Sequence, residues 1–101
     1  MIEQLWQEHY SAEFPTGCAG EEIEGIDLAS LDGDTAGCIS TFLMRRGELD
    51  LWRTAALGLC YRDLTIVIQQ LDGEARDYFY RLETLSKLVL ESVRDGASKD
   101  R

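Results

Sequence analysis

ARDYFYRLETLSKLVLESV, residues 75–93, is the clearest helical pattern in the chain. Its apolar side chains recur at intervals of three and four residues, which is the period of an α-helix. They fall within an arc of about 120° on a helical wheel, the width of a stripe that faces a core. These residues are Ala75, Tyr78, Phe79, Leu82, Leu85, Val89 and Val93. We therefore predict a helix over 73–94, capped by Asp72 and ended by Gly96.

The preceding segment, residues 50–71, is apolar around more than half of its circumference. A helix with this pattern needs cover from two directions, so we expect it to be the central helix of the fold. The run Leu64–Ile68 also has strand propensity, but the long flanking pattern favours a helix over a strand.

Another long helix is predicted over 27–46. The RRG sequence of residues 45–47 ends it, because two cations suit the last turn of a helix and glycine suits the C′ position. Its start has two candidates, a cap at Asp27 or a cap at Asp34. The spacing of apolar residues from Leu28 onward favours the longer helix.

The beginning of the chain is predicted as a short helix over 2–10, with Leu5, Trp6 and Tyr10 turned inward. Residues 10–25 hold the only proline and three of the nine glycines, which indicates a loop or an arm. We therefore expect one all-α domain over 1–101. It is an antiparallel bundle of three main helices with a short N-terminal helix and a glycine-rich acidic loop over 1–26, and with a frayed tail over 96–101.

The charge of the chain is concentrated in its first part. The 101 residues include 19 acidic and 10 basic side chains, for a net charge of −9. The first 44 residues contain nine acids and no Lys or Arg, so the whole net charge belongs to them. Such a field repels nucleic acid and anionic lipid, and it favours a basic protein surface or a cation.

The location is expected to be cytoplasmic. The chain opens with acidic residues where a secretory signal needs basic ones, and the longest uncharged stretch, Thr35–Met44, is about half of what a membrane span needs. The three cysteines are 20 and 22 residues apart, which suits neither a disulfide framework nor a zinc site. We expect Cys38 and Cys60 to be buried free thiols, and Cys18 to be the most exposed of the three.

No motif assigns a catalytic residue, a metal site or a cofactor. The sequence Asp32-Gly33-Asp34 imitates the start of a calcium loop, but Leu43 stands where a bidentate Glu belongs. His9 is the only histidine, and we expect it to be solvated or partly packed.

Asp63 is the one carboxylate inside the apolar arc of residues 50–71, and Gln70 follows it on the same face. A buried carboxylate must be paired or have its pKa raised, so both residues are candidate buried polar groups. A bond to an arginine or to a tyrosine hydroxyl of another helix is one expectation. A functional carboxylate, or a helix surface that meets a second chain, are the others.

These features favour a non-enzymatic module for protein–protein interaction, which forms a homodimer or binds a basic protein surface. It is expected to bind neither nucleic acid directly nor a membrane. The candidate contact residues are Glu21, Glu22, Glu24, Asp27, Tyr61, Tyr80 and Leu88. A first alternative is a small enzyme or a metal- or ligand-binding protein centred on Asp63 and the acidic N-terminal region, with Glu8 and His9. A second is an acidic mimic of nucleic acid, whose carboxylates must lie on one face.

Overall fold

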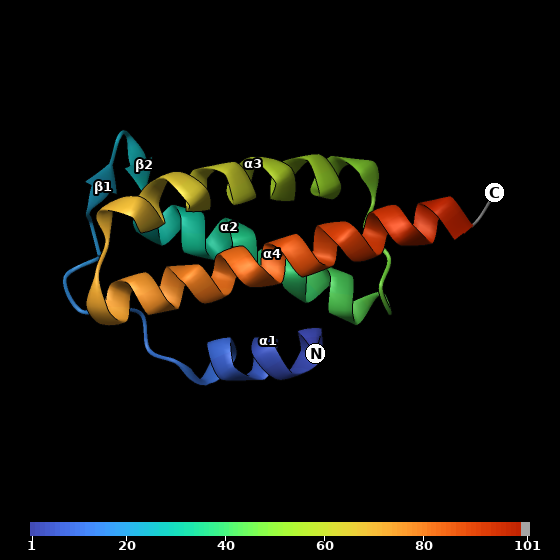
Figure 1. Cartoon of the computed structure of the whole chain (residues 1–101), viewed down its shortest axis with the longest axis horizontal. Coiled ribbons are helices and arrows are strands. Elements are labelled where there is room, and N and C mark those ends of the chain that lie inside the picture. The colour runs from blue at the N-terminus through green and yellow to red at the C-terminus, as the bar shows by residue number, and fades with distance from the viewer. Residues whose placement is uncertain (100–101) are drawn as a thin grey trace.

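The computed structural model describes residues 1–99, in which four α-helices and one small β-hairpin pack together (Figure 1). The expected all-α bundle is confirmed, including its short N-terminal helix. In chain order the elements are α1 (Ile2–Ser11), β1 (Glu22–Ile23), β2 (Ile26–Asp27), α2 (Leu28–Met44), α3 (Leu51–Val67), the 3₁₀ turn η1 (Ile68–Gln70) and α4 (Gly73–Lys99).

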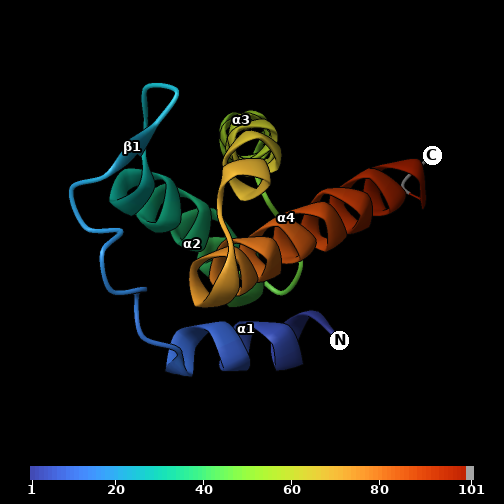
Figure 2. The ribbon, with the colours of Figure 1, turned by 60° about the vertical axis from the view of Figure 1, so that its left-hand side comes forward.

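Helix α4 holds the bundle together, because it contacts α1, α2 and α3. Successive helices run in alternating directions, and α1 and α3 lie on opposite sides of α2 and α4 (Figures 1 and 2). The prediction that the segment 50–71 forms the central helix is therefore wrong. Helix α3 is covered where it meets α2 and α4, and its outer side remains open, with Leu51 and Trp52 exposed.

Helix α2 has the longer of its two predicted extents. The carboxylate of Asp27 accepts a hydrogen bond from the backbone N–H of Ser30 at 2.9 Å and so caps the helix at its start. The acidic segment before it is not a plain loop, because Glu22 pairs with Asp27 and Ile23 with Ile26 in an antiparallel ladder. Glu24 and Gly25 make the turn with φ values of 50° and 80°, as a two-residue type I′ hairpin requires.

Helix α2 ends at Met44, two residues before the predicted end, so Arg45 and Arg46 follow its last turn and do not lie in it. The N–H of Arg46 bonds to the carbonyl of Leu43, and the N–H of Gly47 bonds to the carbonyl of Phe42 at 2.8 Å. This pair of bonds is the Schellman motif. The left-handed C′ position is held by Arg46, with φ of 56°, while Gly47 occupies the next position.

The end of α4 was predicted wrongly. The helix continues through Gly96 to Lys99, because Gly96 does not adopt the left-handed conformation that stops a helix. A glycine inside a helix costs about 1 kcal/mol relative to alanine and does not by itself end it. The predicted frayed tail over 96–101 is therefore helical over residues 96–99, and its last two residues lie outside the described part of the chain.

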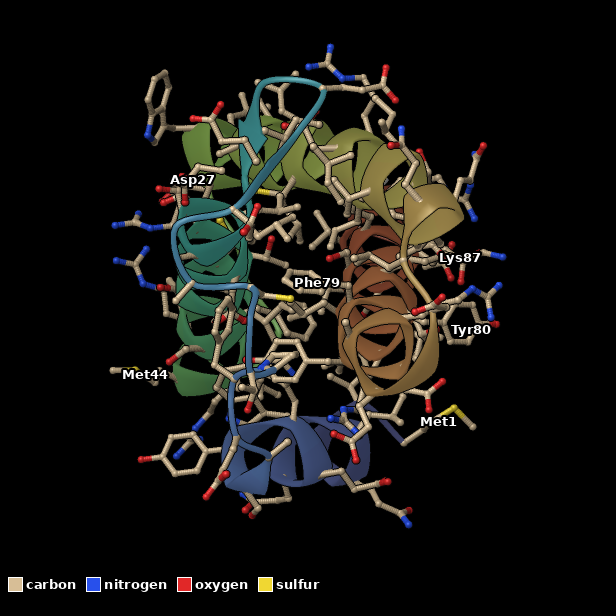
Figure 3. All side chains as sticks on the ribbon, turned by 90° about the vertical axis from the view of Figure 1, so that its left-hand side faces the viewer. Met1, Asp27, Met44, Phe79, Tyr80 and Lys87 are labelled. Atoms are coloured by element: carbon tan, nitrogen blue, oxygen red, sulfur yellow. The ribbon has the colours of Figure 1, made fainter. Side chains whose placement is uncertain are left out.

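The core lies between the helices, with Phe79 at its centre (Figure 3). All seven residues of the predicted α4 stripe are buried or pack against the core. Cys38 and Cys60 are buried free thiols, as expected. Cys18 is buried too, contrary to expectation, because turn bonds from its N–H to Pro15 and from Glu21 to its carbonyl fold the loop back over the core.

Candidate interaction surface

The hairpin presents an acidic edge at one end of the bundle. Glu21, Glu22 and Glu24 are all exposed, and the carbonyl of Glu21 accepts a hydrogen bond from the N–H of Leu28 at 3.1 Å. The hairpin is therefore fixed to the start of α2. Glu22 pairs in the ladder with Asp27, which caps α2, so these predicted contact residues lie together in and beside one hairpin.

A groove of about 510 Å³ runs from this hairpin between α2 and α3. On the α2 side, Leu31, Asp34 and Cys38 line it at spacings of three and four, so they share one helical face, and the N-cap residue Asp27 lines it four residues before Leu31. Two of them, Leu31 and Cys38, are buried and belong to the groove floor, whereas Asp27 is half-buried and Asp34 is exposed. This wall is therefore apolar at its base and acidic at its rim.

The α3 wall has the same spacing. Trp52, Ala56, Leu59 and Asp63 line the groove at intervals of four, three and four. The side chains of Trp52 and Leu59 are 80% and 56% exposed, which is a large apolar surface for two residues on one helix face. Asp63 adds a third carboxylate, at the hairpin end of the groove.

Asp63 and Gln70 are not the buried polar pair that the sequence suggested. The side chain of Asp63 is 27% exposed, and its nearest cation is the neighbouring Arg62 at 3.4 Å, not an arginine of another helix. Gln70 is exposed, and its Nε2 atom donates a hydrogen bond to the carboxylate of Glu24. It thereby fastens the tip of the hairpin to the end of α3. Asp63 is therefore half-buried on the open outer side of α3, and the prediction that Gln70 is buried is wrong because Gln70 lies exposed in the 3₁₀ turn after α3.

Of the three predicted apolar contact residues, only Tyr80 is exposed enough to contact a partner. Tyr80 is 52% exposed, but it lies on the opposite side of the bundle from Asp27 in Figure 3. Tyr61 and Leu88 are half-buried. The exposed apolar groups of α3 are instead Leu51, Trp52 and Leu59.

Sequence reasoning missed these groups because it assumed cover on both sides of α3. The signal was the breadth of the apolar arc itself: a three-helix bundle leaves one side of such a helix without a neighbour.

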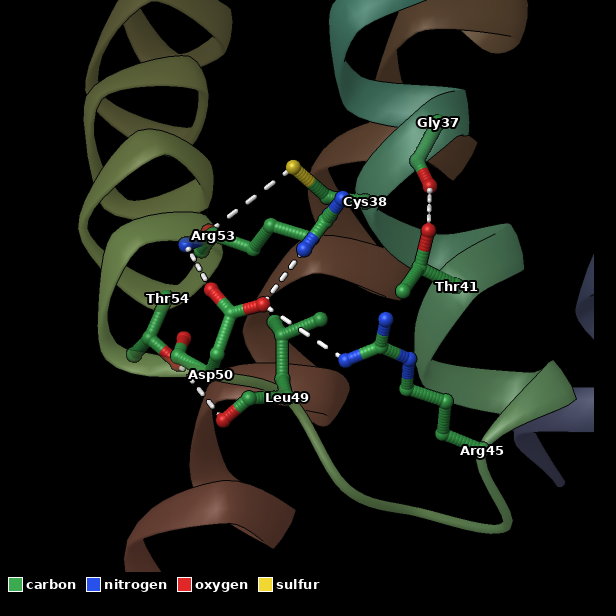
Figure 4. Close-up of polar contacts among 8 residues, drawn as sticks. All are labelled: Gly37, Cys38, Thr41, Arg45, Leu49, Asp50, Arg53 and Thr54. Carbon is green, nitrogen blue, oxygen red and sulfur yellow. Dashed lines mark hydrogen bonds and ion pairs between the residues drawn. The ribbon is translucent and has the colours of Figure 1, made fainter.

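Polar contacts around Asp50 hold α2 and α3 together where they connect, at the end of the groove away from the hairpin (Figure 4). The carboxylate of Asp50 accepts the backbone N–H of Arg53 at 2.8 Å and also binds the guanidinium of Arg53. Arg45 approaches the same carboxylate at 3.7 Å. These hydrogen bonds hold the pKa of Asp50 below its usual range. The same carboxylate pairs with Arg53, which is among the residues that line the groove.

A second polar cluster lies on the other side of α2, where α1, α2 and α4 meet. His9 is 5% exposed, and its Nε2 atom lies 3.3 Å from Oδ1 of Asp32. The hydroxyl of Tyr78 donates to the same oxygen at 2.9 Å. Burial, together with this carboxylate, raises the pKa of Tyr78 far above its ordinary value.

The prediction for α1 is wrong at two positions, because it turned Tyr10 inward and expected His9 to be solvated or partly packed. Tyr10 is 75% exposed, and His9 is the buried member of α1. The signal was present, since His9 lies three residues after Trp6 and four after Leu5, and so continues their stripe.

The residues of the enzyme or metal hypothesis are not brought together. His9 faces Asp32 between α1, α2 and α4, whereas Asp63 lines the α2–α3 groove, and Glu8 is exposed. Among the described residues, no three His, Cys, Asp or Glu side chains form a group that suits a metal ion. Burial raises the pKa of the Cys38 and Cys60 thiols, so these groove cysteines are protonated and unreactive near neutral pH.

Comparison with known proteins gives no match to a family model, to a curated protein or to a solved structure. Within the described residues, no helix has both the length and the apolar character needed to cross a membrane.

Proposed function

We propose that this chain is a non-enzymatic interaction module that binds a basic protein through its hairpin and the adjoining α2–α3 groove. The observation that carries the proposal is the meeting of Glu21, Glu22 and Glu24 with the groove carboxylates at one end of the bundle. Opposite charge on a partner would speed association and fix its orientation.

A nucleic-acid mimic is less well supported. The nine acids of the first 44 residues are spread over α1, the loop after it, the hairpin and the first half of α2, and α1 and the hairpin lie on opposite sides of the bundle in Figures 1 and 2. A mimic needs its carboxylates in one row, spaced like phosphates.

Self-association is the second candidate, and the exposed Trp52 and Leu59 favour it. A symmetric contact through α3 would, however, bring the acidic groove rims of two copies near each other, so we favour a basic partner.

The cytoplasm is the proposed location. Its support is the set of three free cysteines, which suits a reducing compartment.

Two measurements test the proposal. Native mass spectrometry on protein purified gently from its own cells should show an added protein mass. A homodimer alone would favour self-association, and a bound metal or small molecule would overturn the proposal. The association rate constant of a co-purified partner should then fall at least about tenfold between low and high salt, because exposed charges are screened.

A pair of matched variants locates the contact. Replacement of Glu21, Glu22 and Glu24 by Gln should slow association, since all three side chains lie on the hairpin edge. Replacement of Glu3, Glu8 and Glu13 by Gln removes the same charge from exposed positions in and beside α1 and should have a much smaller effect. Equal effects would mean that net charge alone, and not the hairpin, recruits the partner.

A further inference from the structure

We infer that the α2–α3 groove accepts one amphipathic, lysine- or arginine-bearing helix of the partner, so that the bound helix completes a three-helix packing with α2 and α3. This inference rests on the proposed function and adds the form of the ligand to it. The spacing, the exposed apolar groups and the charge of the groove support it.

The spacing of the groove walls matches a helix. Both walls present residues at intervals of four, three and four, which is the repeat by which one helix packs along another. The α2 wall extends from Asp27 to Cys38 and the α3 wall from Trp52 to Asp63. At 1.5 Å per residue each wall is about 16 Å long, which suits about three turns of a bound helix.

The apolar part of the groove combines a buried floor with large apolar side chains that are exposed at its edge. Leu31, Cys38 and Cys60 form a buried floor, and Trp52 and Leu59 stand largely exposed at its edge. A tryptophan that is 80% exposed beside a groove is the kind of residue that dominates binding energy when a partner covers it. The apolar face of an amphipathic helix would cover both exposed side chains.

The rim of the groove specifies a basic ligand. Asp27 and Asp34 stand on one wall and Asp63 on the other, so carboxylates flank the apolar strip on both sides. Of the three nearby cations, Arg45 and Arg53 both approach the carboxylate of Asp50, and Arg62 is paired with Asp63. A helix with an apolar stripe between two basic rows therefore complements the groove.

The hairpin limits the length of the ligand. Gly25 and Ile26 close one end of the groove, and the hydrogen bond from Gln70 to Glu24 holds the hairpin in that position. A second copy of this chain is a poorer occupant, because its own α3 would bring Asp63 and an acidic hairpin toward the same rim.

The test uses the whole chain and two synthetic peptides of about 14 residues with identical composition of Leu, Lys and Ala. In the first peptide the leucines follow helical spacing of three and four, with lysines on both flanks. In the second, the same residues are scrambled so that no apolar stripe forms. Binding is followed by fluorescence anisotropy of labelled peptide. We expect the patterned peptide to bind at least about tenfold more tightly than the scrambled one.

Variants connect this preference to the groove. Trp52→Ala and Leu59→Ala should each weaken binding of the patterned peptide about tenfold or more, because both side chains are exposed anchors outside the core. Tyr80→Ala is the matched control, since Tyr80 is a similarly exposed apolar residue on α4, and it should leave binding unchanged. Circular dichroism of each variant checks that the helices are intact.

The other outcomes separate the inference from the proposed function. Equal, salt-sensitive binding of both peptides would overturn the helix-in-groove inference and leave the acidic contact standing. Failure of both peptides at low salt would overturn both. Another outcome is an affinity for the patterned peptide that is independent of salt and unchanged in the double variant Asp34→Asn/Asp63→Asn. That result would show that the groove does not select a basic ligand, and it would overturn the proposed function. A homodimer that Trp52→Ala dissociates would assign the groove to a second copy.

Discussion

The Nε2 atom of His9 lies 3.3 Å from the Oδ1 atom of Asp32, and this contact joins α1 to α2. The same oxygen accepts the hydroxyl of Tyr78 from α4, so one carboxylate atom connects three helices. The ring centroids of His9 and Tyr78 are 4.5 Å apart, which adds aromatic packing to the polar contact. Helix α1 packs mainly against α4, and the His9–Asp32 contact adds a polar link from α1 to α2.

Replacement of His9 by Ala should therefore loosen α1. It removes a buried ring and leaves Asp32 with a single partner, so the free energy of unfolding should fall by about 1–3 kcal/mol. Amide hydrogen exchange over residues 2–11 should accelerate more than exchange in α4. Glu8→Ala, at an exposed neighbouring position, should change stability by less than about 0.5 kcal/mol. Unchanged exchange in α1 would show that the cluster does not hold the helix.

Because Tyr78 is buried, we predict that the free energy of unfolding falls at alkaline pH. Burial, followed by its bond to Asp32, raises the pKa of Tyr78 in the folded chain. A raised pKa contributes stability that is complete below the ordinary tyrosine value of 10.0 and is lost as the pH rises toward the folded value. Urea unfolding at a series of pH values above about 9 should thus show a steeper decline for the native chain than for Tyr78→Phe.

The exposed Tyr80 provides the control for this experiment. Tyr80→Phe should keep the full alkaline decline. Some decline should remain in Tyr78→Phe, because burial also raises the pKa of Cys18, Cys38 and Cys60. Identical slopes for the native chain and Tyr78→Phe would contradict a raised tyrosine pKa.

The helices were predictable because their signals are local. The α4 stripe from Ala75 to Val93, the cap at Asp27 and the RRG stop of residues 45–47 each act within a few residues. The long α2 could be favoured on spacing alone, since two internal glycines weaken a helix without stopping it.

The arrangement of the helices was not predictable in the same way. Whether the broad apolar arc of α3 is covered depends on which helix becomes central, and that is set by packing between distant segments. The same limit explains the exposure of Trp52 and the burial of His9 against Asp32, 23 residues away. Part of the candidate site, the acidic hairpin, was found from charge, whereas the groove required the relative placement of α2 and α3.

We predict that Asp50, at the α2–α3 corner, stabilises the fold and that this stabilisation is lost at acidic pH. Its pKa is lowered chiefly by the hydrogen bond from the backbone N–H of Arg53, and also by the Arg53 guanidinium. A lowered pKa contributes stability that is present above the ordinary value of 3.8 and is lost as the pH falls through the folded value. Asp50→Asn keeps an acceptor for the helix cap but removes the charge.

The stability difference between the native chain and Asp50→Asn should therefore shrink as the pH is lowered from about 6 to about 2. Thermal unfolding followed by circular dichroism at several pH values measures it. Glu48→Gln, an exposed carboxylate in the same connection, should give no such trend. A difference that stays constant with pH would assign the role of Asp50 to packing and not to charge.

Arg46 is the position where a substitution should stabilise the fold. It occupies the left-handed C′ position after α2 with φ of 56°, a conformation that is unfavourable for a residue with a Cβ atom and natural for glycine. Arg46→Gly should raise the free energy of unfolding by about 1 kcal/mol relative to Arg46→Ala, which removes the same side chain and keeps the Cβ atom. Chemical denaturation of both variants separates the backbone effect from the loss of the guanidinium. Equal stability of the two would mean that the Schellman bonds to Leu43 and Phe42 are already unstrained with a Cβ atom at this position.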